Sequence, residues 1–148
     1  MFFNSVHSYL PRILIIEPSQ IVSLLKQPTM DDFKLNTMEY VLCGGLPIGR
    51  RTRKQFLERF TSVRYMTNGA GLLEAAPGAM IPNIGGRQNH DSVGCAISTG
   101  EIKVVCSATG KEMDLEGKGE LCLRGPTVMQ GYLNEDPHAD EDGWYHTG

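Results

Sequence analysis

MEYVLCGGLPIGRRTRKQFLERFTSVRYM, residues 38–66, alternates between strand-like and helix-like patterns. Its first part, 38–43, is an apolar run of strand length that the Gly44-Gly45 pair interrupts. Residues 48–60 predict an amphipathic helix, because apolar residues recur every fourth position and charges occupy the other faces. Residues 62–66 form a second candidate strand. The order strand, helix, strand favours a parallel sheet with packed helices.

A second helix is predicted on the N-terminal side of this stretch. Residues 18–27 begin with a proline, which suits the first helical turn. Ile21, Leu24 and Leu25 recur at helical spacing, and Pro28 ends the pattern.

The character of the sequence changes after residue 83, where a glycine pair and the polar run RQNHDS predict a turn. Beyond it, residues 101–106 and 120–124 are typical of short strands separated by glycine turns. The expected fold class is therefore α/β. Residues 1–91 are expected to form part of a parallel-sheet subdomain with packed helices. Residues 92–148 are expected to form part of a small antiparallel β-barrel-like subdomain.

The composition is that of an ordinary globular protein, with 41% hydrophobic and 21% charged residues in 148. A formal net charge of −3 argues against a nucleic-acid-binding surface. No run approaches the ~18 apolar residues of a membrane-spanning helix, so no transmembrane segment is expected. The one basic cluster lies in the predicted helix 48–60 and is interpreted as its solvated face: Arg50, Arg51, Arg53 and Lys54.

The cysteines and histidines match no familiar motif for metal binding or catalysis. No two cysteines form C-x-x-C, and each lies in or beside an apolar stretch, which suits reduced, buried thiols; they are Cys43, Cys95, Cys106 and Cys122. The four histidines are scattered, and we assign none of them to a metal or to acid–base catalysis.

The C-terminal part carries the most specific pattern. GELCLRGPTVMQGYLN (119–134) and DGWYHTG (142–148) together resemble a segment of acyl-adenylate-forming, AMP-binding enzymes: acyl-CoA synthetases, 4-coumarate-CoA ligases and firefly luciferase. That family segment reads Gly-Glu-Leu-x-x-Arg-Gly-Pro, then Gly-Tyr, then Asp-Gly-Trp-x-x-Thr-Gly-Asp. The resemblance extends over about residues 14–148. It implies ATP-dependent activation of a fatty or aromatic carboxylic acid as an acyl-adenylate, followed by transfer to CoA.

Residues 43–48, CGGLPI, are the first candidate site. Two glycines after a strand suit close approach of a ligand, although a plain strand-to-helix turn has the same pattern. The segment resembles the family's Ser-Gly-Gly/Ala-Ala-Pro-Leu, whose backbone lies along the adenine. The resemblance implies nucleotide contact from Gly44, Gly45 and Leu46. Leu46 replaces a small alanine of the family, so its larger side chain narrows the space for the adenine.

Residues 68–74, NGAGLLE, are the second candidate site. They resemble the family's Gln-Gly-Tyr-Gly-Met/Leu-Thr-Glu, with both glycines and Glu74 in register. The resemblance implies that Glu74 places magnesium and phosphate, as a catalytic and metal-binding residue; the alternative is an ordinary surface carboxylate. It implies nucleotide contact from the rest of the segment: Asn68, Gly69, Ala70, Gly71, Leu72 and Leu73.

Three positions in this segment depart from the family, and the first is Asn68, a shorter amide than the family's glutamine. Ala70 lacks the ring that stacks on adenine, a loss of ~1–3 kcal/mol by comparison with base stacking on proteins. Leu73 lacks a phosphate-binding hydroxyl, a loss of roughly 10²–10³ in rate by comparison with an oxyanion-hole donor. Both changes predict weak catalysis.

Other family positions are interpreted as architectural. Ser92-Val93-Gly94 resembles an element at the join between subdomains. Arg124 and Tyr132 are interpreted as structural, and Trp144 as a core residue.

Three family parts are not found in these 148 residues: the phosphate loop, the ribose-binding aspartate and the C-terminal lid domain with its catalytic lysine. We therefore expect a fragment of an AMP-forming acid–CoA ligase, inactive as this chain. The alternative is a non-catalytic pseudoenzyme, acting as a ligand-binding or protein-interaction module. The resemblance implies ATP, Mg²⁺ and CoA as cofactors and a cytoplasmic or peroxisomal location. The acid and the oligomeric state stay open.

Overall fold

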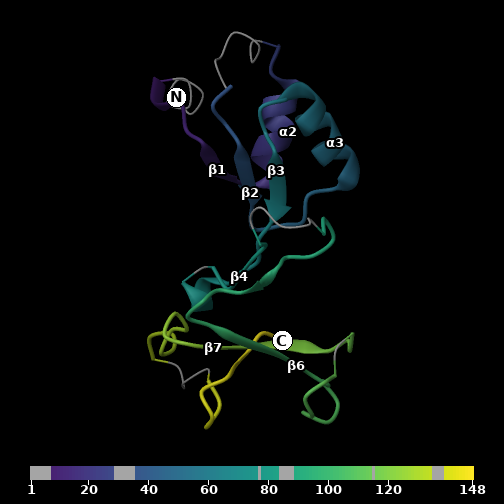
Figure 1. Cartoon of the computed structure of the whole chain (residues 1–148). Coiled ribbons are helices and arrows are strands. Elements are labelled where there is room, and N and C mark those ends of the chain that lie inside the picture. Colours follow the sequence, from purple (N-terminus) through teal and green to yellow (C-terminus); the bar gives the residue numbers. More distant parts are fainter. Residues whose placement is uncertain (1–7, 29–35, 77, 84–88, 115, 135–138) are drawn as a thin grey trace. The chain divides into compact units, whose positions relative to one another are not determined.

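The structure is a computed structural model that describes residues 8–28, 36–76, 78–83, 89–114, 116–134 and 139–148. The chain divides into two compact units (Figure 1). The first contains Met1–Ala70 and Pro82–Gly94, and the second contains Gly71–Ile81 and Cys95–Gly148. Each unit is described by itself.

The first unit contains a parallel sheet of three strands in the order β1-β2-β3. Ile13 pairs with Tyr40 and Tyr40 with Tyr65, while Cys43 pairs with Asn68 at the carboxyl ends. Each connection between neighbouring strands contains a helix, as parallel pairing requires. The elements are β1 (Ile13–Ile16), α2 (Pro18–Lys26), β2 (Tyr40–Cys43), α3 (Arg50–Arg59) and β3 (Tyr65–Asn68).

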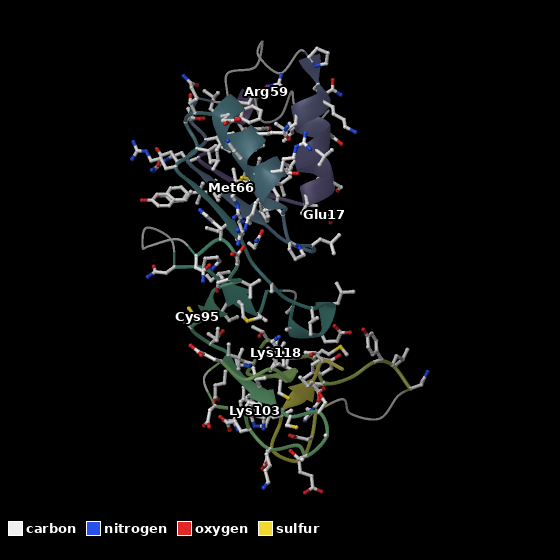
Figure 2. The ribbon with its side chains drawn as sticks, turned by 90° about the vertical axis from the view of Figure 1, so that its right-hand side faces the viewer. Glu17, Arg59, Met66, Cys95, Lys103 and Lys118 are labelled. Atoms are coloured by element: carbon white, nitrogen blue, oxygen red, sulfur yellow. The ribbon has the colours of Figure 1, made fainter. Side chains whose placement is uncertain are left out.

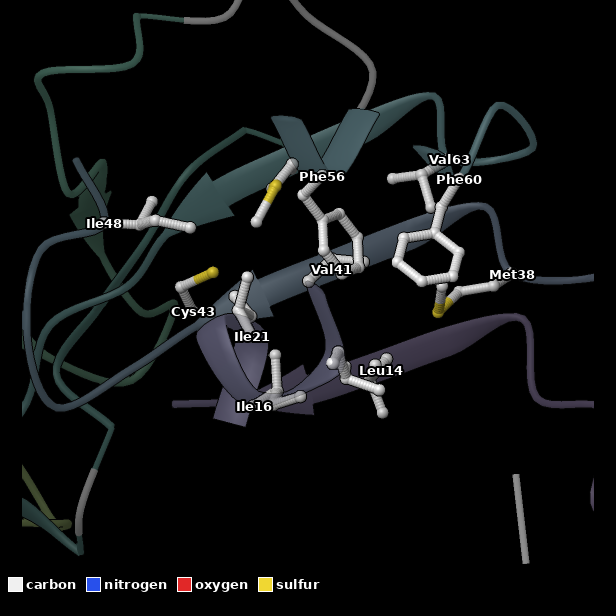
Figure 3. Packing of buried hydrophobic residues seen from close by; sticks show 12 residues of the cluster. Leu14, Ile16, Ile21, Met38, Val41, Cys43, Ile48, Phe56, Phe60 and Val63 are labelled. Carbon is white, nitrogen blue, oxygen red and sulfur yellow. The ribbon is translucent and has the colours of Figure 1, made fainter. Parts of the chain in front are cut away.

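Both helices pack against one face of this sheet. Alternate strand residues are buried, as the pleat dictates. Figure 3 shows Ile21 of α2 and Phe56 of α3 pointing toward Val41 of β2, and all three are within 1% of full burial. The core of the first unit lies here.

The opposite face of the sheet is less covered. Ile13 and Ile15 of β1 are 59% and 72% exposed. Tyr40 and Tyr65 stack on each other with ring centroids 5.1 Å apart. Parallel sheets usually have both faces covered, so this apolar face is unusual for the architecture.

The second unit consists of antiparallel pairs. A two-stranded sheet joins β4 to β5, and a three-stranded sheet has the order β6-β7-β8. Val105, Cys122 and Trp144 form a small buried cluster, which confirms the core position predicted for Trp144. The elements are η2 (Leu73–Ala75), β4 (Met80–Ile81), β5 (Cys95–Ala96), β6 (Glu101–Val105), β7 (Glu120–Arg124) and β8 (Tyr145–His146).

The mixed α/β class is therefore confirmed, with a parallel sheet and antiparallel sheets. None of the sheets formed by the described residues is closed, so the barrel-like part of the expectation is not established. The strand predicted at 62–66 lies later, at Tyr65–Asn68. The reason is a turn after α3, in which Val63 N donates to Phe60 O at 3.0 Å.

Within the described ranges, no helix has both the length and the apolar character needed to cross a bilayer.

Candidate functional site

The loops that follow the three parallel strands start at one edge of the sheet. Gly44, the first residue after β2, donates its N–H to Ile16 O at 3.2 Å. Gly69, the first residue after β3, donates its N–H to Cys43 O at 2.8 Å. These bonds continue the ladder by one residue, so the Gly44 and Gly69 loops begin side by side. Carboxyl ends of parallel strands are where ligands bind in open α/β sheets.

The Gly44-Gly45 turn leaves its backbone accessible. Gly45 has φ +83°, a conformation that favours glycine, and a Cβ built on Gly44 would meet nothing within 4 Å. A hollow of about 180 Å³ lies over this turn, and Leu46 lines it with 71% of its surface exposed. Glu17, labelled in Figure 2, lines the other side. The turn itself is open to a flat ligand, and Leu46 offers that ligand only apolar contact.

Asn68 is held by bonds within the first unit. Its side chain is 6% exposed, its Oδ1 accepts from Ile48 N at 3.3 Å, and its Nδ2 donates to His90 O at 3.4 Å. The amide therefore ties the loop after β2 to β3 and to the segment at His90. The resemblance implies a longer glutamine at this position in the family, whereas the Asn68 amide makes both bonds here.

Arg53 corrects one sequence interpretation. Arg50, Arg51 and Lys54 are exposed, as expected of a solvated helix face, but Arg53 is only 4% exposed. Both of its terminal nitrogens donate to His90 O at 3.3 Å, and burial lowers the pKa of the guanidinium. The helical spacing of α3 explains the error, since Arg53 lies three residues before the buried Phe56 and so shares its face.

A larger hollow, of about 870 Å³, lies beside Arg53 and contains none of the predicted site residues. An ion pair between Arg50 and Asp91 borders it and holds the pKa of the Asp91 carboxyl below its usual range. Its other lining residues are Lys54, Leu57, Glu58, Asn89 and His90. Its mixed charges do not favour one class of ligand.

Residues 71–74 belong to the second unit, whereas 68–70 belong to the first. Leu73 is 82% exposed in η2. Glu74 is half-buried, and its Oε1 accepts from the Tyr132 hydroxyl at 2.7 Å. Its main-chain oxygen accepts from Met129 N at 2.8 Å. Two bonds from residues 129–132 thus hold Glu74, one at its carboxylate and one at its main chain.

Sequence reasoning missed the role of Tyr132, which it treated as architectural. The partner lies 58 residues away from Glu74, so no local spacing could indicate the pair. Burial, and then the charge of Glu74, raise the pKa of Tyr145, which places the Tyr145 phenol near the same carboxylate.

The cysteine expectation holds in part. All four thiols are free, and Cys43 and Cys122 are buried. Cys95 is exposed and Cys106 half-buried, contrary to expectation, because the strand β5 at Cys95 is only two residues long.

Comparison with known proteins identifies the family. The model of the AMP-binding enzyme family matches residues 1–133. This chain belongs to the AMP-binding enzyme family. The match covers the first unit and most of the second, including both candidate segments.

The similar curated proteins include a CoA ligase and a luciferase. A 4-coumarate–CoA ligase of Pinus taeda is 28% identical over 97% of this chain and 28% of its own length. Luciferin 4-monooxygenase of Photinus pyralis is 30% identical over the whole chain and 27% of its own length. The chain thus spans about a quarter of these AMP-binding relatives.

Solved structures of the family share the fold. An anthranilate CoA ligase in complex with anthranoyl-AMP has a TM-score of 0.83 at 17% identity, over 99% of this chain and 28% of its own. A red-emitting luciferase of Phrixothrix hirtus has a TM-score of 0.72 at 27% identity, over 99% of this chain and 26% of its own. At 17% identity the likeness concerns the fold alone.

The residues present fit the family's cofactors unevenly. Mg²⁺ is usually held by one or two carboxylates together with substrate phosphates and water, so a single fixed carboxylate at Glu74 is sufficient. The open backbone at Gly44 suits a flat base. The Leu73 side chain gives a phosphate no donor, and the Ala70 side chain gives an adenine ring no stacking surface.

Proposed function

We propose that this chain forms the nucleotide-facing part of an ATP-dependent, AMP-forming carboxylic acid–CoA ligase. The observation that carries the proposal is the Gly44-Gly45 turn, which lies open at the carboxyl edge of a parallel sheet in a chain of the AMP-binding family. In the proposed reaction, the acid's carboxylate attacks the α-phosphorus of ATP and pyrophosphate leaves. The thiol of CoA then attacks the acyl carbonyl, and AMP leaves.

Each candidate segment has a proposed role. The backbone of residues 44–46 is proposed to lie along the adenine, and residues 68–73 are proposed to contact the nucleotide. Glu74 would hold Mg²⁺, which would supply positive charge to the phosphates, and the Tyr132 hydroxyl, 2.7 Å from Oε1, would orient that carboxylate.

The substrate class follows from the relatives. They include a ligase named for 4-coumarate, an aromatic carboxylic acid, and the family resemblance of the sequence extends to ligases of fatty acids. We propose an aromatic or fatty acid as substrate, and the cytoplasm or the peroxisome as the location. The open β6-β7-β8 sheet is proposed to be part of a barrel-like subdomain.

A non-catalytic role is the second candidate. Leu73 presents an apolar side chain, 82% exposed, where the resemblance requires a hydroxyl, and Ala70 lacks the stacking ring. Both departures fall at the nucleotide, whereas the glycines beside them persist. A protein that binds a ligand or a partner without adenylation would tolerate this combination.

A chimera tests the two candidates. Residues 1–148 replace the matching segment of the Pinus taeda ligase, with and without Ala70→Tyr and Leu73→Thr together. Acid-dependent exchange of pyrophosphate into ATP is measured with a panel of aromatic and fatty acids. We expect the doubly substituted chimera to exchange, and the unsubstituted one to be slower by roughly 10²–10³, the typical loss for one transition-state donor.

Glu74→Gln in the doubly substituted chimera should abolish exchange, because the amide cannot replace the carboxylate on Mg²⁺. Glu116→Gln, a change of an exposed glutamate in the same unit, is the matched control and should leave the rate unchanged. A doubly substituted chimera that unfolds cooperatively but shows no exchange with any acid would reject the ligase proposal.

A further inference from the structure

Three side chains with metal-binding atoms meet on one face of the β6-β7-β8 sheet. Glu120 and Cys122 are two positions apart on β7, so they project to the same side. His146 of β8 pairs directly with Cys122 in the antiparallel register and shares that face. All three residues belong to the second unit. The candidate nucleotide residues include none of them.

The distances between these atoms match those between ligands on one ion. Cys122 Sγ lies 3.4 Å from His146 Nδ1, and His146 Nδ1 lies 3.3 Å from Glu120 Oε2. The three ligand atoms all lie within 4.8 Å of one another. Tetrahedral Zn²⁺, with bonds of about 2.3 Å to sulfur and 2.0–2.1 Å to nitrogen or oxygen, spaces its ligands roughly 3.3–3.6 Å apart. Only a small adjustment of the carboxylate is therefore needed.

We propose that Glu120, Cys122 and His146 form a binding site for a divalent zinc-type ion. The sulfur, nitrogen and oxygen set is one that Zn²⁺ accepts, whereas Mg²⁺ and Ca²⁺ prefer oxygen alone. Water completes the fourth position. The site is separate from the proposed magnesium position at Glu74 and does not depend on the proposed ligase activity.

The surrounding groups orient the ligands as metal sites require. Asp140 Oδ2 lies 3.4 Å from His146 Nε2, the nitrogen that does not face the thiol. A carboxylate on the far nitrogen of a metal-binding histidine fixes the tautomer that leaves Nδ1 free to coordinate. Asp140 is itself fixed, because its Oδ1 accepts from Trp144 N at 2.8 Å and from Asp142 N at 3.0 Å.

Glu120 is oriented in the same way. Its Oε1 accepts from Gly148 N at 3.0 Å, which turns Oε2 toward His146. The pKa of the Glu120 carboxyl is held below its usual range by this main-chain bond and by His146. Both carboxylate oxygens of Glu120 are therefore held, with Oε2 facing His146 Nδ1.

An ion can reach the site from the imidazole side. Cys122 is fully buried, the Glu120 side chain is 17% exposed and that of His146 is 42% exposed. Burial raises the pKa of the Cys122 thiol, so coordination must release its proton. Lys103, labelled in Figure 2, pairs with Cys122 across β6 and β7.

The same contacts could serve only as hydrogen bonds that hold β8 onto β7. Metal binding separates the two interpretations. Co²⁺ alone is titrated into the reduced 148-residue chain, and the near-ultraviolet thiolate-to-cobalt band is recorded together with the visible bands of tetrahedral Co²⁺. We expect both signals to saturate at one ion per chain and to disappear when Zn²⁺ displaces the cobalt.

Variants assign the signal to these residues. Cys122→Ser should abolish the thiolate band, and His146→Asn should weaken binding at least tenfold. Asp140→Asn should weaken it ~10–100-fold, the usual effect of removing such an orienting carboxylate. Cys95→Ser and Cys106→Ser, which change thiols outside the cluster, are matched controls and should keep the band.

The proposal is overturned by absence of the band in the unsubstituted chain, or by a band that survives Cys122→Ser. A band lost in Cys95→Ser or Cys106→Ser would also overturn it, since it would assign the thiolate elsewhere. Cys122 is buried, so its variant could lose structure; the exposed His146 then decides. Unchanged Co²⁺ affinity in His146→Asn rejects the site.

Discussion

Asn68 holds two neighbouring segments with one buried amide, and its removal should be measurable. Asn68→Ala leaves the N–H of Ile48 without its acceptor, while His90 O keeps its two bonds from Arg53. An unsatisfied buried donor costs ~1–3 kcal/mol. We expect the free energy of unfolding of the first unit to fall by about this amount. Urea unfolding, monitored by the helical circular dichroism signal, measures the change.

Gln55→Ala is the control for this prediction. It also removes an amide side chain, but Gln55 is exposed on α3. It should shift the transition little. Equal effects of the two substitutions would show that the Asn68 bonds contribute nothing specific.

The thiol of Cys43 should resist alkylation far more than that of Cys95. Burial raises the pKa of Cys43 to about 11, and its side chain is fully buried, whereas Cys95 is exposed. The thiolate is the reactive form, so at pH 8 the folded chain should label at Cys95 while Cys43 stays protected until denaturant is added. Mass spectrometry of the labelled peptides measures both rates. Comparable rates in the folded chain would contradict the buried position.

The limits of the sequence argument are clearest at single residues. The glycines at 44–45 and the strand at 120–124 could be predicted, because turn and strand signals are local. The bond from Tyr132 to Glu74 and the meeting of Cys122 with His146 could not. Their sequence separations are 58 and 24 residues, and only the register of the sheets or the path of the loops brings them together.

At the scale of elements, the turn between β2 and α3 depends on one glycine more than on its neighbour. Gly45→Ala would hold alanine at φ +83°, which costs about 1–2 kcal/mol, although the space is adequate. Gly44→Ala should be neutral or stabilising by up to ~1 kcal/mol, since its φ is not in the left-handed region and nothing lies within 4 Å. Urea unfolding of both variants measures the contrast. A Gly44→Ala variant less stable than Gly45→Ala would contradict this backbone.

Helices α2 and α3 of the first unit are joined by Arg59. Its guanidinium, on α3, donates to Leu25 O at 2.8 Å and to Gln27 O at 2.9 Å at the end of α2. These carbonyls have no partner within their own helix, so the bonds cap α2. Arg59→Met should lower the free energy of unfolding by ~1.5–3 kcal/mol in a thermal or urea transition.

Arg51→Met, on an exposed position of the same helix, is the matched control for Arg59→Met. Equal stability of the two variants would show that the cap is not formed in solution. The apolar spacing in the sequence predicted both helices correctly. It could not predict that Arg59, in the last turn of α3, bonds to the end of α2.

At the scale of the whole molecule, the buried cores of the two units are unequal. Among the described residues, the first unit buries 12 hydrophobic side chains and the second buries seven, most of them smaller. Small cores supply little net stability once the entropy of ordering the chain is counted. Sequence composition gave the total apolar content, but the division between the cores depends on which residues each sheet buries.

The chain should therefore unfold in two steps, with the second unit first. Trp144 is the single tryptophan and lies in the second unit, whereas α2 and α3 lie in the first. Tryptophan fluorescence and the helical circular dichroism signal thus report different units of the same chain. We expect the fluorescence midpoint at lower urea.

Phe56→Ala, which removes a fully buried ring and costs ~3–5 kcal/mol, should lower the helical midpoint and leave the fluorescence midpoint in place. Coincident midpoints that Phe56→Ala moves together would mean that the two cores unfold as one cooperative structure.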